Sequence, residues 1–166
     1  MNKNKTLYWS DIHFGHKNIL EYCNRPFNTI EDHDEYYINL WNNHISENDI
    51  IFYVGDFLFG SKQRCKEILD RLNGIKYLIR GNHDRFTINK YIEYGFKNVF
   101  EYKINYINGK NVLISHYPYI YIDKLKNIYD ENNCVLNIHG HIHGKNIDNT
   151  TLINVSCDYC KIPFKF

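Results

Sequence analysis

The sequence lacks a long apolar run, and it has little proline or glycine. Its 166 residues include 3 prolines and 9 glycines, which are dispersed, so neither a linker nor a low-complexity tract is visible. No window approaches the ~20 apolar residues that span a bilayer. The polar start of the chain leads directly into Leu7, with no apolar segment of signal-peptide type. We therefore expect a single domain, residues 1–166, that is cytoplasmic and has no membrane partner.

An excess of one charge is also absent. The 20 Lys and Arg residues against 19 Asp and Glu residues leave a formal net charge of +1. Long-range electrostatic capture of a polyanion is therefore disfavoured, so nucleic acid is not the favoured partner. The 5 cysteines are an odd, scattered set, which makes a disulfide framework improbable. A chain of this length buries roughly 68–70% of its surface without such help, so a bound metal would serve chemistry.

Buried strands alternate with helices in the amino-terminal half. Three short apolar runs, each ending at a polar cluster, predict strands at Thr6–Ser10, Asp49–Val54 and Ile75–Arg80. Between them, Thr29 with Asp32 predicts a capped helix that continues to Ile45. A second helix is expected over Lys62–Leu72, ending at Asn73-Gly74. This half therefore has a βαβαβ pattern.

The second half begins with a predicted hairpin. Strands Tyr102–Ile107 and Asn111–Ser115 flank Asn108-Gly109, the favoured type of two-residue turn. A helix around Ile120–Glu131 is expected next, followed by strands near Cys134–Ile138 and Thr151–Val155. Together the two halves predict an α/β fold with one mixed sheet or two packed sheets.

Polar side chains gather just beyond the ends of these strands. In open α/β sheets the carboxyl ends of the strands form the ligand crevice, so such residues can converge from distant parts of the chain. A single histidine beyond a strand end is weak evidence for a site. Five histidines in such positions would need five coincidences if their placement were due to chance. The residues are Asp11, His13, Asp56, Asn82, His83, His116, His141 and His143.

The ligand types of this set indicate which metals it would hold. Imidazole, carboxylate and carboxamide groups without thiolate suit Mn, Fe, Zn, Co or Ni. Seven candidate ligands exceed the needs of one ion, whereas two divalent ions ~3.5–4 Å apart that share a carboxylate would use them all. Such a centre keeps a net positive charge and attracts anions, above all phosphate.

The order and spacing of these motifs resemble the calcineurin-like metallophosphoesterase superfamily. The resemblance spans residues 10–143 and rests on Asp11-Ile12-His13, Gly55-Asp56, Gly81-Asn82-His83-Asp84, His116 and Gly140-His141-Ile142-His143. The segments Ser10–His16 and Arg25-Pro26-Phe27 further resemble a small bacterial and phage branch of single-domain phosphoesterases. The resemblance implies a four-layer αββα sandwich, in which helices flank two mixed sheets.

The resemblance also implies a role for each residue of the set. Asp11, His13 and His143 would hold one metal ion. Asn82, His116 and His141 would hold the other, and Asp56 would bridge the two. A hydroxide bridging the ions would attack phosphorus, so that no protein nucleophile is needed. His83 would act as general acid or transition-state stabiliser, with Asp84 orienting its ring.

Several nearby residues are weaker candidates. His16 and Arg25 could contact the phosphate of a substrate. His139 should point away from the cleft, since strand alternation separates it from His141. The Cys157–Cys160 CxxC pattern has no second pair and indicates core packing. His33 and His44 are assigned no role.

The expected function is hydrolysis of phosphodiester or phosphomonoester bonds with two divalent ions, manganese among the candidates. Diesters are preferred because no cap domain or basic cradle is evident for gripping a dianionic monoester. The substrate would be small and phosphorylated, and a nucleotide-like one is open, since Tyr117, Tyr119 and Tyr121 could stack on a base. A DNA or RNA nuclease with the same centre is an alternative. A second alternative is a non-enzymatic scaffold, as in the retromer subunit of similar fold. The presence of the full ligand set counts against this alternative.

Overall fold

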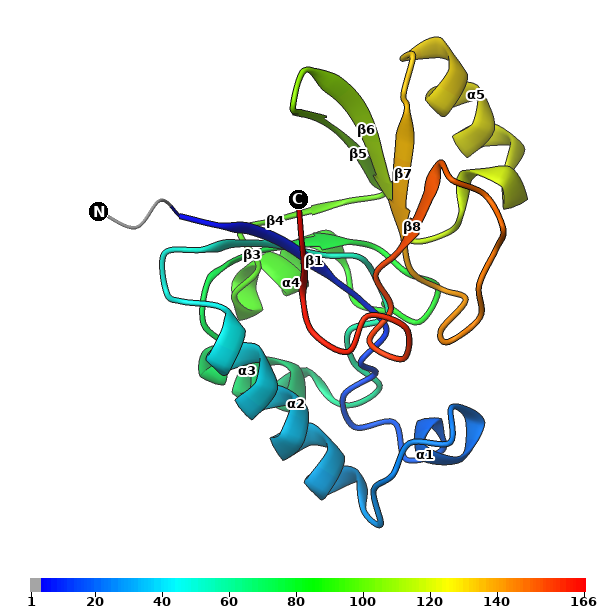
Figure 1. Cartoon of the computed structure of the whole chain (residues 1–166). Helices are drawn as coiled ribbons and strands as arrows, with labels where there is room; N and C mark the ends of the chain where they lie inside the picture. Colours follow the sequence, from blue (N-terminus) through cyan, green and yellow to red (C-terminus); the bar gives the residue numbers. More distant parts are fainter. Residues whose placement is uncertain (1–3) are drawn as a thin grey trace.

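Two β-sheets packed face to face between helices make up the computed structural model, which describes residues 4–166 (Figure 1). The elements are β1 (Thr6–Trp9), α1 (Ile19–Tyr22), α2 (Ile30–His44), β2 (Ile50–Tyr53), α3 (Lys62–Arg71), β3 (Ile75–Ile79), α4 (Ile88–Tyr94), β4 (Asn98–Phe100), β5 (Tyr102–Ile107), β6 (Lys110–Ser115), a 3₁₀ turn at Tyr119–Tyr121, α5 (Asp123–Glu131), β7 (Leu136–His139), β8 (Leu152–Asn154) and β9 (Phe164–Lys165).

Both sheets are mixed. The first has the order β4-β3-β2-β1-β9, in which β1 to β4 are parallel and β9 pairs antiparallel with β1. The second has the order β5-β6-β7-β8, in which the β5-β6 hairpin is antiparallel and β6, β7 and β8 are parallel. The parallel strands of each sheet therefore end at a common edge, where their following loops meet.

Side-chain alternation divides the core into layers. In β1, Leu7 and Trp9 belong to the cluster that also contains residues of α2, α3 and α4, whereas Tyr8 packs between the two sheets against the second. The outer face of the second sheet packs Leu113 against Tyr129 of α5. The layers therefore run helices, sheet, sheet, helix, and the predicted αββα sandwich of two mixed sheets is confirmed.

Local signals in the sequence explain several element boundaries. The Thr29 hydroxyl accepts a hydrogen bond from Asp32 N at 3.1 Å and begins α2 as expected. Ser61 caps α3 in the same way, through Arg64 N. The tight β5-β6 turn requires positive φ at both residues, which Asn108 (50°) and Gly109 (82°) supply.

Four elements were not predicted from the sequence, namely α1, α4, β4 and β9. The strands β4 and β9 have 3 and 2 residues, too few to show an alternating pattern. The helix expected over Ile120–Glu131 starts with the 3₁₀ turn, so α5 begins only at Asp123. Within residues 4–166, every helix falls short of the length and apolar content needed to cross a membrane.

Candidate metal centre

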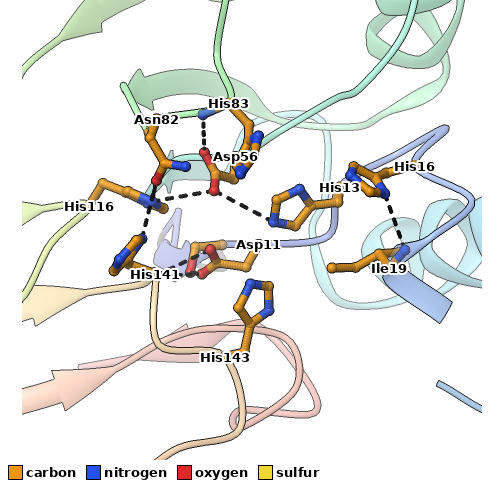
Figure 2. Close-up of polar contacts among 12 residues, drawn as sticks. Asp11, His13, His16, Ile19, Asp56, Asn82, His83, His116, His141 and His143 are labelled. Carbon is orange, nitrogen blue, oxygen red and sulfur yellow. Dashed lines mark hydrogen bonds and ion pairs between the residues drawn. The ribbon is translucent and has the colours of Figure 1, made fainter. Parts of the chain in front are cut away.

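The strand ends of both sheets bring the eight polar residues together. Asp11 and His13 follow β1, Asp56 follows β2, and Asn82 and His83 follow β3. From the second sheet, His116 follows β6, while His141 and His143 follow β7. Figure 2 shows these side chains surrounding one small region, with Asp11 and Asp56 at its centre. Each sheet therefore supplies part of the site.

Asp56 lies between the two groups of candidate ligands. Its Oδ2 is 3.5 Å from His13 Nε2 and 3.4 Å from His116 Nε2. The same nitrogen, His116 Nε2, lies 3.1 Å from Asn82 Oδ1, which is also 3.1 Å from His141 Nδ1. The Asp56 carboxylate therefore lies next to ligands of both halves of the centre, as a bridging ligand must (Figure 2).

Donor atoms within the cluster lie close enough to share a cation. One atom from each of Asp11, His13 and His143 lies within 4.8 Å of the others, and the same holds for Asp11, Asp56 and His116. Both ring nitrogens of His13 are buried, and neither has a hydrogen-bond partner among residues 4–166. Because an unpartnered buried imidazole is costly, these atoms fit the nitrogen donors that a divalent metal takes.

Two of the histidines are oriented by a partner on their other nitrogen. His116 Nδ1 is 2.9 Å from the carbonyl of Val54, and His143 Nδ1 is 2.8 Å from Asp158 Oδ2. Each contact leaves Nε2 as the nitrogen available to a cation. A backbone carbonyl or carboxylate behind a ligating histidine is the usual arrangement around protein-bound metals. The residues present therefore fit a divalent cation in both halves.

The backbone at the centre is held in the left-handed region. Asp11, His13, Asp56, His141 and His143 have φ values of 59°, 57°, 57°, 69° and 52°. Non-glycine residues adopt this conformation rarely, and it concentrates at functional sites because the surrounding structure must enforce it. All five are candidate metal ligands, so the strained backbone coincides with the candidate metal centre.

Two glycines let the neighbouring chain pass close to the carboxylates. A Cβ at Gly81 would overlap Asp56 Oδ1, and a Cβ at Gly140 would overlap Asp11 Oδ2. Both glycines directly precede a candidate ligand, Asn82 and His141. Their lack of a side chain is therefore required by the packing of the site itself.

Burial and charge set the protonation of the central groups. Burial alone would raise the pKa of Asp56, but His116 and His13 beside it hold that pKa well below its usual range. Burial works against the charged form of His116, yet its contact with Asp56 raises the pKa to about 9. Burial and the nearby His116 lower the pKa of His141 to about 4. Asp56 is therefore anionic, and cation binding would displace a proton from His116.

Asp84 does not orient the ring of His83, contrary to expectation. Its carboxylate accepts hydrogen bonds from the backbone N–H groups of Gly81, Asp56 and Phe57 at 2.8–3.0 Å. Burial raises the pKa of Asp84 to about 6. Asp84 therefore ties together the loops after β2 and β3, and its oxygens are already used. His83 is instead positioned by its own backbone N–H, which donates to Asp56 Oδ1 at 2.8 Å.

Arg25 is not exposed to a substrate, so its expected contact with phosphate is wrong. The residue is 6% exposed. Its guanidinium donates to the carbonyls of Asp11 and Ile12 at 2.6 Å each, and to both oxygens of Asp158 at 2.7 and 2.9 Å. Since Asp158 also holds His143, Arg25 connects the loop after β1 with the loop after β7.

Sequence reasoning missed three residues of this buried network. Asp158 lies within the Cys157–Cys160 pattern, which indicated only core packing, and no motif includes Asp34. His33 was assigned no role. In the structure His33 Nε2 lies 2.7 Å from Arg25 Nη1, and His33 Nδ1 lies 2.9 Å from Asp34 Oδ1. The adjacent Arg25-Pro26-Phe27 motif was the available signal, but burial decides what the arginine does.

The remaining histidines differ in their relation to the centre. His16 is half-buried at the edge of the cleft, with its ring centroid 5.7 Å from that of His13, and its Nδ1 accepts from Ile19 N at 3.1 Å. His139 is buried, with its Nδ1 2.9 Å from the carbonyl of Gly140. A cleft of about 750 Å³ lies beside the centre and is lined by five histidines, His13, His16, His83, His141 and His143.

Comparisons with known proteins agree with this architecture. A family model described as the calcineurin-like phosphoesterase superfamily domain matches residues 5–155. The chain is 35% identical over 157 residues to an uncharacterized protein of Methanocaldococcus jannaschii, covering 93% of this chain and 78% of the relative. It is 27% identical over 163 residues to the Gene 66 protein of Mycobacterium phage D29, covering 86% and 80%.

Solved structures share the fold. A protein of unknown function from Aquifex aeolicus superposes with a TM-score of 0.80 at 26% identity, covering 97% of this chain and 95% of that one. A structure described as a novel archaeal phosphodiesterase gives a TM-score of 0.51 at 19% identity, covering 93% and 85%, a likeness of fold alone. The matched family model spans β1 to β8 and all eight residues of the cluster, and the chain belongs to the calcineurin-like phosphoesterase superfamily.

Proposed function

We propose that the protein is a two-metal phosphodiesterase. Asp11, His13 and His143 would hold one divalent ion and Asn82, His116 and His141 the other, with Asp56 shared between them. The observation that carries this proposal is the convergence of seven candidate ligands, Asp56 among them, together with the buried ring nitrogens of His13, which have no hydrogen-bond partner among the described residues. Bound there, the two ions would supply Lewis-acid activation of water and neutralise phosphate charge.

The donor set leaves the identity of the metals open. Nitrogen and oxygen ligands without thiolate suit Mn, Fe, Zn, Ni and Co alike. We propose Mn²⁺ as the first ion to test.

His83 is the proposed general acid or transition-state stabiliser. Its backbone N–H donates a hydrogen bond to Asp56, which holds the residue at the edge of the centre in any rotamer of its ring. Its ring Nδ1 is buried and makes no hydrogen bond to another of the described residues. A histidine without a competing partner can donate a proton or a hydrogen bond to the leaving oxygen of a substrate.

Diesters suit this site better than monoesters. A monoester dianion would need cationic side chains in addition to the metals, and two of the arginines near the centre are already paired. Arg25 is paired with Asp158, and Arg64 is paired with Asp34 at 3.1 Å. The shared fold with an archaeal phosphodiesterase supports the same reaction class. The substrate class we propose is therefore a small molecule with a singly charged phosphodiester.

The test combines metal content with a substrate panel. The purified protein is reconstituted with Mn²⁺, Ni²⁺, Co²⁺ or Zn²⁺, and its bound metal is counted by mass spectrometry. Hydrolysis of a model diester, a model monoester and a nucleic acid is then measured. We expect two equivalents of metal and the fastest turnover with the diester.

Two variants and one control make the result decisive. Asp56→Asn should lose metal and activity, whereas His83→Ala should keep both metals and lose activity. His44→Ala is the matched control, since His44 lies on α2 outside the cluster and should change neither. A protein that binds no divalent metal, or an active Asp56→Asn variant, would refute the proposal. Cleavage of nucleic acid in preference to the diester would instead make it a nuclease.

A further inference from the structure

A second hollow meets the metal centre at His83. It has a volume of about 300 Å³ and is lined by Leu58, Phe59, Gly60, His83, Arg85, Phe86 and Tyr91. The large cleft beside the centre shares only His83 with it. The second hollow is therefore distinct from the cleft that His141 and His143 line, and its described lining residues include none of the seven candidate metal ligands.

The position of His83 indicates which part of a substrate would reach this hollow. In an in-line displacement the leaving oxygen is opposite the attacking oxygen, and a proton donor must lie within about 2.6–3.2 Å of it. If His83 serves that oxygen, the carbon skeleton attached to the oxygen extends past the ring of His83. The hollow beyond His83 is then the space that receives the leaving group.

The walls of the hollow are apolar and aromatic, apart from one guanidinium. Arg85 Cζ lies 4.9 Å from the centroid of the Phe59 ring, and Phe86 packs against Tyr91 at 5.5 Å. Among the described residues Arg85 has neither a hydrogen-bond nor an ion-pair partner. No carboxylate lines the hollow. These surfaces suit a planar ring that can lie against both an aromatic face and a guanidinium.

Phe59 is the central wall residue. It is 39% exposed, although its ring is large and apolar. The ring of His16 lies 4.6 Å from it and that of His83 lies 6.5 Å away, so Phe59 stands between the catalytic edge and the open hollow. An exposed aromatic side chain in this place is a surface that a bound ring would cover.

We propose that Phe59, Arg85 and Phe86 form a leaving-group subsite that selects phosphodiesters with a planar aromatic leaving group. This proposal rests on the proposed phosphodiesterase function. A volume of about 300 Å³ is at the lower limit of ligand pockets, so the subsite takes one aromatic ring system and not a polymer.

The test compares two diesters whose leaving oxygens are chemically alike. Benzyl methyl phosphate and ethyl methyl phosphate both release a primary alcohol, but only benzyl alcohol carries a ring. With the Mn²⁺-loaded protein we expect kcat/KM to be ~10-fold higher for release of benzyl alcohol than for release of ethanol, in line with a stacked ring. Thymidine 5′-methyl phosphate, releasing thymidine, tests whether the ring is a nucleobase.

Variants show whether the preference comes from this hollow. Phe59→Leu and Arg85→Ala should reduce the benzyl preference toward unity, because turnover of benzyl methyl phosphate falls more than turnover of ethyl methyl phosphate. Tyr106→Leu is the matched control, since Tyr106 is an aromatic residue on β5 that is 76% exposed. Competitive inhibition by benzyl alcohol or thymidine gives a second readout, and Phe59→Leu should weaken it. Thermal melting shows that each variant is folded.

The outcomes separate the two proposals. Hydrolysis of ethyl methyl phosphate with no preference for a ring would overturn the subsite and leave the phosphodiesterase proposal standing. Equal losses on both substrates in Phe59→Leu would also overturn it. Failure of every diester in the metal-loaded protein would instead refute the proposed function. A preference for the thymidine or the benzyl compound supports the subsite and identifies which ring fits.

Discussion

The two halves of the candidate metal centre differ in how they are held. Asp11 and His13 are buried, and His143 is fixed by Asp158, which Arg25 holds from behind. In the other half only His116 is buried. There Asn82 is exposed and contacts the rings of both His116 and His141 through its single Oδ1.

This difference indicates which half is preformed. Arg25 donates hydrogen bonds to Asp158 and to the backbone carbonyls of Asp11 and Ile12. These contacts involve no metal ion, so they hold the first half in place before an ion binds. The second half depends on one solvent-exposed carboxamide. Since a preorganised site loses less entropy on binding, we expect the Asp11–His13–His143 half to bind its ion more tightly.

The largest expected effect removes the group that both halves share. Asp56→Asn should lower activity by more than ~100-fold. Mutation of a residue that only orients a metal ligand already lowers metal affinity or activity by about 10–100-fold, and Asp56 is proposed to bind the metals directly. Metal content should fall below two equivalents by mass spectrometry. Asp49→Asn is the matched control, since Asp49 accepts hydrogen bonds from Lys5 and Ser46 at the far end of β2. Wild-type metal content in Asp56→Asn would contradict the shared role.

Asn82→Ala should disable only the exposed half. We expect the variant to bind about one metal equivalent fewer and to be ~100-fold less active. The free energy of unfolding should change by no more than about 0.5 kcal/mol, because the side chain is exposed. Calorimetric titration with Mn²⁺ and urea unfolding measure the two quantities. Asn127→Ala, at an exposed position on α5, provides the baseline, and retention of both ions would count against the assignment.

Arg25→Met should weaken the preformed half and the fold together. Breaking a buried ion pair typically costs about 3–5 kcal/mol, so the melting temperature should fall even without metal. The affinity for the tighter ion should drop ~10–100-fold while the weaker ion is unaffected. Arg64→Met serves as the comparison, since the Arg64–Asp34 pair is partly exposed. If titration shows that the affinities for both ions fall equally, Arg25 does not stabilise the first half alone.

The smallest effect concerns the pH dependence of the buried network. Burial lowers the pKa of His33 and the nearby Arg25 lowers it further, although the contact with Asp34 acts in the opposite direction. The unfolded chain therefore binds this proton first, so stability is present above about pH 6.5 and is lost as the pH falls below it. His33→Gln should lose less stability between pH 7.5 and 5 than the wild type, by at most about 1.4 kcal/mol per pH unit. Urea unfolding at both pH values measures it, with His44→Gln as control. Parallel pH profiles would exclude His33 as the source.

Sequence reasoning predicted the layers of the fold because the strongest patterns carry them. The runs at β1, β2 and β3 and the Asn108-Gly109 turn are local signals, and each corresponds to an observed element. Residues at the strand ends could be grouped because parallel strands place their carboxyl ends at one edge. Their roles as metal ligands stay predictions that the proposed titrations test.

The misassigned residues failed for a common reason. Arg25 and Asp84 are charged and lie near the motifs, so a surface role or a contact with the neighbouring His83 was the natural expectation. In the structure both are buried, and their hydrogen bonds include backbone groups of loops distant in the sequence. Which loop lies beside a charged side chain depends on tertiary packing, which periodicity and spacing do not encode.

Gly81 and Gly140 have a consequence for mutational tolerance. Neither carries a functional group, yet any larger residue would project into a carboxylate of the centre. A saturation library screened for catalysis should therefore be as depleted at these two positions as at the histidines, while glycines in open loops accept substitution. Engineering of this scaffold must therefore leave that pair of small residues untouched, along with the histidines that line the cleft.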